Sequence, residues 1–105
     1  MTEQTGPTIV YVSYQGTPET HFDREYYVTQ HIPLLTRSWQ PHGLESAAAF
    51  FRAVDEPGTI AICELRFRDA DALTAAMAAP ETQAVMADVA QFTAIKPMRV
   101  RAAAM

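Results

Sequence analysis

The sequence is poor in the residues that mark several common classes of protein. Its 105 residues include one cysteine, Cys63, and therefore no intrachain disulfide framework. They include one lysine, Lys96, and the formal net charge is −4, which disfavours nucleic acid and anionic membranes as partners. The four glycines form no phosphate-binding loop, so we expect no nucleotide cofactor. No apolar run approaches the ~20 residues that cross a bilayer.

The N-terminal segment also lacks the features of a signal peptide, since MTEQTGP has no basic region and no apolar run. With a single cysteine, this composition predicts a cytoplasmic protein. We expect residues 1–7 to form a flexible tail and residues 8–105 to form one domain. The hydrophobic fraction of 49% is sufficient for the core of a domain of this length.

Strands are indicated by short runs of β-branched and aromatic residues bounded by glycine and proline. The segment 44–53 is rich in alanine, which favours a helix, but Gly43 before it and Phe50 and Phe51 within it favour a strand. The four predicted strands cover residues 8–14, 44–53, 59–67 and 93–102.

Two helical regions separate these strands. The first is expected from about His21 to about Gln40, with Thr20 as its N-cap. The second is expected to follow Asp69 as an N-cap and to restart at Pro80. The order β-α-β-β-α-β predicts a ferredoxin-like α+β fold, a four-stranded antiparallel sheet with helices on one face.

The helices can cover only one face of such a sheet. The predicted strands are nevertheless apolar on both faces, because residues 9–12 and 60–62 are consecutive apolar positions. We therefore expect a homodimer in which two sheet faces pack together. The space between the sheets would hold a small apolar or aromatic ligand.

The first helical region contains a proline at position 33, where it cannot donate to the carbonyl of Thr29. We expect a kink that directs the ring of His31 toward the open side of the sheet. The freed carbonyl would orient the imidazole or bind a ligand hydroxyl or water. In the alternative interpretation, His31 is a half-buried helix residue and Pro33 marks a bend.

The remaining candidate site residues follow from strand alternation and helix spacing. Tyr27 precedes His31 by four residues and shares its face of the helix. Glu64 is expected to face the dimer cavity and to pair with Arg66, Arg99 or His31, or else to form an intersubunit or surface ion pair. No spacing of His, Cys, Asp and Glu predicts a metal site. The other expected pocket residues are Tyr11, Ser13, Trp39, Ile60, Ile62 and Arg66.

Several segments together resemble the EthD family of dimeric α+β-barrel proteins over about residues 8–101. They are VYVSYQG, FDREYYVTQHIPLL, ELRFRDADAL and PETQAVMADVAQFT. The family carries an acidic residue, an aromatic pair and a His-x-Pro motif, which here are Asp23, Tyr26, Tyr27, His31 and Pro33. Asp88 matches a recurring acidic position, for which we expect capping or a salt bridge.

The resemblance implies an assembly of two chains and chemistry without a metal or prosthetic group. We expect a cofactor-independent enzyme of catabolism or secondary metabolism that acts on a cyclic or aromatic compound as an isomerase, a cyclase/dehydratase or a monooxygenase. His31 would accept or donate a proton, assisted by Tyr27 and Glu64. The alternative is a non-catalytic or stress-related dimer that binds an apolar ligand.

Overall fold

The computed structural model describes residues 6–103, so residues 1–5 of the predicted tail lie outside the described residues. Four strands form one antiparallel sheet in the order β2-β3-β1-β4. This is the predicted ferredoxin-like arrangement, and the fold class is confirmed. The strands are β1 (Thr8–Gly16), β2 (Leu44–Phe51), β3 (Gly58–Phe67) and β4 (Met98–Ala102).

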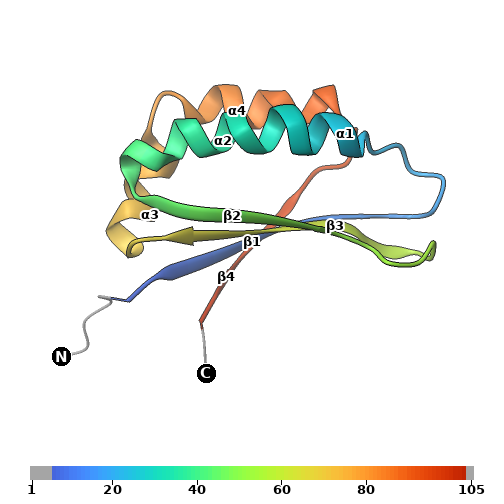
Figure 1. Cartoon of the computed structure of the whole chain (residues 1–105), viewed down its shortest axis with the longest axis horizontal. Helices are drawn as coiled ribbons and strands as arrows, with labels where there is room; N and C mark the ends of the chain where they lie inside the picture. The colour runs from blue at the N-terminus through green and yellow to red at the C-terminus, as the bar shows by residue number, and fades with distance from the viewer. Residues whose placement is uncertain (1–5, 104–105) are drawn as a thin grey trace.

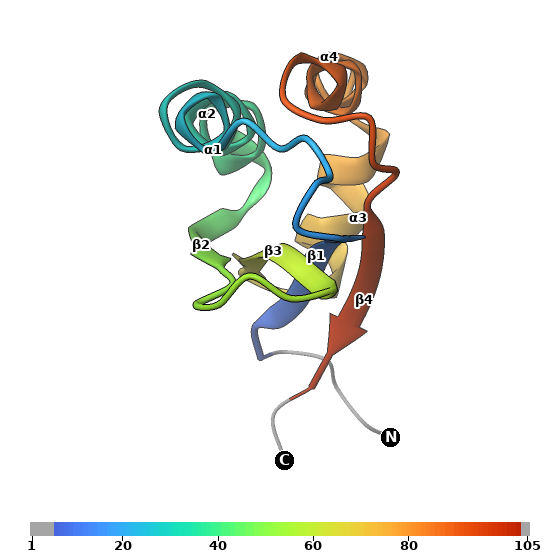
Figure 2. The same cartoon turned by 90° about the vertical axis from the view of Figure 1, so that its right-hand side faces the viewer.

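The helices pack over one face of this sheet and leave the other face without a helix (Figures 1 and 2). The first helical region is continuous but not uniform, because a π-helical turn separates two α-helical pieces. The second region is split as predicted. In chain order the elements are α1 (Arg24–Tyr26), the π-helical turn Tyr27–His31, α2 (Ile32–Trp39), a 3-10 turn Gln40–His42, α3 (Ala70–Ala78), α4 (Thr82–Asp88) and a 3-10 turn Val89–Gln91.

Three predicted boundaries were wrong: the N-cap of the first helical region, the start of α4 and the start of the last strand. The N-cap of α1 is Asp23, whose carboxylate accepts from the amide of Tyr26, whereas the Thr20 hydroxyl accepts from the amide of Thr17 in the preceding turn. Pro80 lies in a turn closed by a bond from the Thr82 amide to the Ala79 carbonyl, and α4 begins only at Thr82.

The third boundary concerns the last strand. β4 begins at Met98, directly after Pro97, and residues 93–97 form an irregular connection instead of the first half of a strand. Proline cannot donate to a strand neighbour, which explains why pairing starts after it. The N-cap of α3 is Asp69, as expected, and its carboxylate accepts from the amide of Ala72.

The expected disturbance around Pro33 takes the form of the π-helical turn that immediately precedes α2. The amide of Ile32 donates to the carbonyl of Tyr27, five residues earlier, instead of to the residue four positions back. Pro33 stands in the first turn of α2, where its missing amide is tolerated. The interruption therefore falls on the turn that carries both Tyr27 and His31.

The first helical region ends at Gly43, which has a positive φ of 108°. A Cβ atom at this position would lie 2.5 Å from the Cβ of Ala72 in α3. Only glycine combines this backbone conformation with so close an approach. Gly43 thus joins the end of the first helical region to β2 and allows α3 to pack against the junction.

Alternation along the strands separates the two faces of the sheet. On the helix-covered face, buried residues of β1 and β3 include Val10, Tyr14, Cys63, Leu65 and Phe67. The uncovered face retains exposed apolar side chains, since Phe50, Met98 and Val100 are each 55% exposed. The core therefore lies between the sheet and the helices, as expected for a sheet with helices on one side.

Candidate functional site

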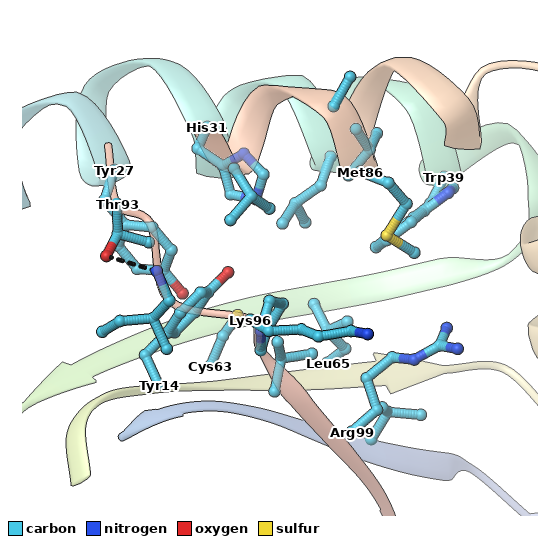
Figure 3. A pocket seen from close by; sticks show the side chains of 18 of the residues that line it. Tyr14, Tyr27, His31, Trp39, Cys63, Leu65, Met86, Thr93, Lys96 and Arg99 are labelled. Atoms are coloured by element: carbon cyan, nitrogen blue, oxygen red, sulfur yellow. Dashed lines mark hydrogen bonds between the residues drawn. The ribbon is translucent and has the colours of Figure 1, made fainter. Parts of the chain in front are cut away.

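A cavity of about 910 Å³ lies between the helices and the covered face of the sheet. Its walls come from the first helical region, α3, α4, the connection 93–97 and the strands β1, β3 and β4. This volume is in the range that holds a small organic ligand. Figure 3 shows His31 and Trp39 above it, with Tyr14, Cys63 and Leu65 below.

His31 is the buried histidine of this cavity, with a side chain only 4% exposed. Its Nδ1 lies 3.0 Å from Oδ2 of Asp88, at the end of α4. A carboxylate only accepts hydrogen bonds, so Nδ1 carries the proton and donates it. Nε2 forms no hydrogen bond with another described residue, which leaves it as the ring nitrogen available to a ligand.

Two opposing effects act on this imidazole. Burial lowers the pKa of His31, and the hydrogen bond and charge of Asp88 raise it; the net direction is below the usual 6.5. The ring is therefore neutral at pH 7 and able to accept a proton on Nε2. Once protonated, its positive charge would face the Asp88 carboxylate.

Asp88 is itself held in place by Tyr26, the first residue of the aromatic pair Tyr26 and Tyr27. The hydroxyl of Tyr26 donates to Oδ1 of Asp88 at 2.7 Å, so the two carboxylate oxygens have separate partners. This hydrogen bond is the largest cause that raises the pKa of Tyr26. Asp88 thus accepts a hydrogen bond from His31, and the pair becomes the expected salt bridge only when the imidazole is protonated.

The orientation of His31 differs from the one expected in two respects. The ring lies on the helix-covered side of the sheet, not toward its open side. The group that orients it is the Asp88 carboxylate rather than the carbonyl of Thr29. The first difference follows from strand alternation, which places the apolar cavity beneath the helices.

Tyr27 stacks on His31, with ring centroids 5.7 Å apart and planes inclined by 18°. Burial strongly raises the pKa of Tyr27, and the nearby Cys63 on β3 raises it further. Tyr27 is therefore a neutral hydrogen-bond donor at any ordinary pH. Burial also raises the pKa of the Cys63 thiol to about 11, which makes it a poor nucleophile at neutral pH.

Trp39 is the third predicted site residue that lines the cavity. Its indole Nε1 donates to the hydroxyl of Thr82 at 2.7 Å. This bond ties α2 to the start of α4, the helix that carries Asp88. Trp39 thus forms part of the wall and also fixes the two helices that bring His31 and Asp88 together.

The other predicted site residues lie away from this cavity. Glu64 occupies the opposite face of β3, where its Oε2 accepts from the hydroxyl of Tyr11 at 2.6 Å. Three more predicted residues share the uncovered face by register: Ser13, Ile62 and Arg66. Arg66 pairs with Glu45 at 3.5 Å. Among the described residues, Glu64 therefore pairs with none of its three expected partners, Arg66, Arg99 and His31.

Ile60 does not lie on the uncovered face with Ile62, as was expected. The register between β1 and β3 shifts next to it, since Tyr14 pairs with Ala61 whereas Gln15 pairs with Thr59. Ile60 is the extra residue of this bulge and is 1% exposed in the core. Alternation alone predicted that it would share a face with Ile62, and this was wrong.

Sequence reasoning missed the cations of the cavity. Lys96, Arg99 and Arg101 line it, and no Asp or Glu does so among the described residues. Arg99 and Arg101 pair with Val12 and Val10 across the sheet, on the covered face. The register of β4 was the signal that placed them, and it required the strand boundary to be known.

Within residues 6–103, no three His, Cys, Asp or Glu side chains lie close enough together to hold a metal ion. Over the same residues, none of the helices has the length and apolar character needed to span a membrane.

A family model of the EthD domain matches residues 15–96. An EthD-like protein from Ralstonia eutropha has a similar structure, with 22% identity, a TM-score of 0.81, and coverage of 93% of this chain and 91% of that one. A dimeric ferredoxin-like protein of unknown function from Thermobifida fusca has 16% identity, a TM-score of 0.61, and coverage of 99% and 97%. No curated protein sequence matches this chain.

The cofactor-independent oxygenase SnoaB from Streptomyces nogalater also has this fold. It has 18% identity, a TM-score of 0.62, and coverage of 93% of this chain and 91% of that one. At these identities the structural likenesses establish the fold alone, whereas the family model covers most of the chain.

Proposed function

Because this chain belongs to the EthD domain family, we propose that it is a cofactor-independent enzyme that moves a proton on a cyclic or aromatic compound bound beneath its helices. The observation that carries the proposal is the His31–Asp88 pair at 3.0 Å on the wall of an apolar cavity. A neutral imidazole oriented by a carboxylate is a suitable general base.

In the proposed step, Nε2 of His31 accepts a proton from a carbon or hydroxyl of the ligand. The ligand becomes an anion and His31 becomes an imidazolium that faces the Asp88 carboxylate. Return of the proton to another carbon is an isomerisation, and its use to expel a hydroxyl as water is a dehydration. Reaction of the anion with dioxygen would be an oxygenation, the activity named for SnoaB.

Tyr27 and Trp39 position the ligand in this proposal. Tyr27 stacks on the imidazole and has a hydroxyl that stays protonated, so it can donate a hydrogen bond to a ligand oxygen. Trp39 supplies an aromatic wall. Glu64 takes no part, because it lies on the other face of the sheet. The carboxylate that pairs with His31 is that of Asp88 instead of the expected Glu64.

We also propose that two chains pair through their uncovered sheet faces. The exposed side chains of Phe50, Met98 and Val100 and the dimeric state named for the Thermobifida fusca relative support this assembly. Pairing would cover the Tyr11–Glu64 hydrogen bond at the centre of the face. The ligand cavity proposed here lies within each chain instead of between the sheets.

The test of the catalytic proposal does not require the natural substrate to be known. The protein is incubated in D₂O with a panel of cyclic ketones, lactones and hydroxylated aromatics, and deuterium incorporation and products are measured by mass spectrometry. His31→Ala should lower the rate by about 10² to 10⁴, the usual contribution of a general base. His21→Ala is the matched control, since His21 is exposed and lies outside the cavity.

Retention of more than a tenth of the rate in folded His31→Ala protein would overturn the assignment of the base. Binding of panel compounds without exchange or product in the wild-type protein would favour a non-catalytic dimer that holds an apolar ligand. Circular dichroism and the melting temperature of each variant establish that it is folded.

A further inference from the structure

The charge on the cavity is opposite to the charge on the whole chain. The formal net charge is −4, yet the cavity is lined by three of the eight Lys and Arg residues. We call Lys96, Arg99 and Arg101 the cationic rim. The apolar interior and this rim are together complementary to a ligand with an apolar body and one acidic group.

The rim residues reach the cavity from two adjoining segments. Lys96 belongs to the irregular connection before β4, and Arg99 and Arg101 project from β4 on the covered face, opposite Val12 and Val10. Figure 3 shows Lys96 and Arg99 extended across the lower part of the cavity, below His31 and Trp39. The positive groups therefore lie apart from the imidazole, with the apolar interior between them.

These cations have no carboxylate partners among the described residues. By contrast, Arg52, Arg66 and Arg68 each pair with an acidic side chain. Among the described residues, the one side-chain hydrogen bond of Arg99 runs from Nη1 to the sulfur of Met77 on α3, at 3.0 Å. A guanidinium held near a soft, neutral atom keeps its hydrogen-bonding capacity for an anion.

Exposure distinguishes the two ends of the cavity. Lys96, Arg99 and Arg101 are exposed, whereas His31 and Trp39 are buried. The rim therefore lies where the cavity meets solvent and the base lies at its closed end. A ligand whose acidic group stays at the rim would insert its apolar ring toward His31 and keep its charge solvated.

We propose that the ligand is an aromatic or alicyclic carboxylic acid, or an equally acidic enol or phenol, whose anionic group binds the cationic rim while its ring occupies the cavity. This inference rests on the proposed function for the position of the reacting atom, but the recognition itself requires no catalysis. It narrows the cyclic and aromatic compounds of the proposal to those that carry a negative charge at neutral pH.

The probes that test it are 2-naphthoate and its neutral, nearly isosteric amide, titrated calorimetrically into the protein at pH 7 and low salt. We expect the carboxylate to bind about tenfold more tightly than the amide, or better, as a charge-assisted contact implies. Arg99→Gln and Lys96→Gln should each weaken 2-naphthoate about fivefold to tenfold and leave the amide within about twofold.

Arg37→Gln is the matched control, because it changes the net charge equally at an exposed position of α2 outside the cavity. It should alter both affinities by less than about twofold, since exposed charges are screened. Equal affinities for the two probes, no binding of either below about millimolar concentration, or an equal loss in Arg37→Gln would overturn the inference. Lys96→Gln keeps the test valid if Arg99→Gln does not fold.

This outcome is separable from that of the catalytic proposal. If acid-selective binding is found but His31→Ala has no effect on any reaction, the rim is a recognition site and the proposed base is wrong. If a His31-dependent reaction is found but the wild-type protein binds 2-naphthoate no more tightly than the amide, the proposed base stands and the rim is not a recognition site.

Discussion

Asp88 controls the chemical state of His31 by opposing the effect of burial. A histidine in this apolar environment loses affinity for its proton, and the carboxylate at 3.0 Å restores part of it. The balance keeps the ring neutral near pH 7 but protonatable in a reaction. Tyr26 contributes indirectly, since its hydrogen bond fixes the carboxylate that orients the imidazole.

This balance predicts the direction in which the titration of His31 moves. In wild-type protein, the ring should titrate below the usual pKa of about 6.5, because burial is the largest effect. Asp88→Asn should move the pKa of His31 further down, since the variant removes the effect that raises it. NMR titration of the Cε1–H signals of the three histidines measures both values, and His31→Gln identifies the signal of His31.

The same titration predicts the pH dependence of activity. Because protonated His31 cannot accept a proton, kcat/KM should fall as the pH drops through the folded-state pKa of His31, below about 6.5. In Asp88→Asn protein, the maximum of kcat/KM should be lower, and its fall should occur at lower pH. A titration of His31 that moves to higher pH in Asp88→Asn would contradict the assigned role of the carboxylate.

At the scale of elements, the site depends on how the two helical regions lie relative to each other. The π-helical turn Tyr27–His31 places His31 beside the end of α4, and the Trp39–Thr82 hydrogen bond joins α2 to its start. Backbone bonds also tie the two regions, since the amide of Asp23 donates to the carbonyl of Phe92 at 2.9 Å. Both ends of the His31–Asp88 contact are therefore anchored.

Gly43 provides a test of the junction between the first helical region and β2. Gly43→Ala should lower the free energy of unfolding by about 3 kcal/mol, from positive φ and from contact with Ala72 at 2.5 Å. Gly58→Ala is the matched control, because Gly58 also has positive φ (131°) but nothing within 4 Å of an added Cβ. It should lose only about 1–2 kcal/mol. Urea denaturation measures the free energy of unfolding of both variants. Equal losses would show that the close approach of Ala72 in α3 does not add to the cost at Gly43.

At the scale of the whole molecule, the uncovered sheet face sets the expected assembly. Light scattering should report twice the mass of one chain, because a face with several exposed apolar side chains favours self-association. Val100→Glu should shift the mass to one chain, since it introduces a charge on β4 at a position 55% exposed. The mass is to be measured over a range of protein concentrations.

Val54→Glu provides the comparison for this variant. Val54 is 58% exposed in the loop between β2 and β3, away from the paired strands, so the same substitution there should leave the mass unchanged. A wild-type mass of one chain at micromolar concentration would show that the uncovered face has another role. It would leave the cavity and the His31–Asp88 pair unaffected.

Local chemistry made the elements readable from the sequence. Hydrophobic runs, the Asp69 cap and the Gly43 stop depend on neighbouring residues, and they sufficed for the order of elements and the ferredoxin-like sheet. The segment around His31 and Pro33 was identified because a proline inside a helix conflicts with the local hydrogen-bonding pattern.

Only the tertiary structure decided which side chains meet. His31 and Asp88 lie far apart in the chain, and their contact depends on the packing of α2 against α4. The bulge places Ile60 in the core, and the pairing of β4 with β1 places Arg99 and Arg101 on the covered face. A sequence specifies local preferences directly, whereas the partner of a buried charge and the charge around a cavity are set by packing between distant segments.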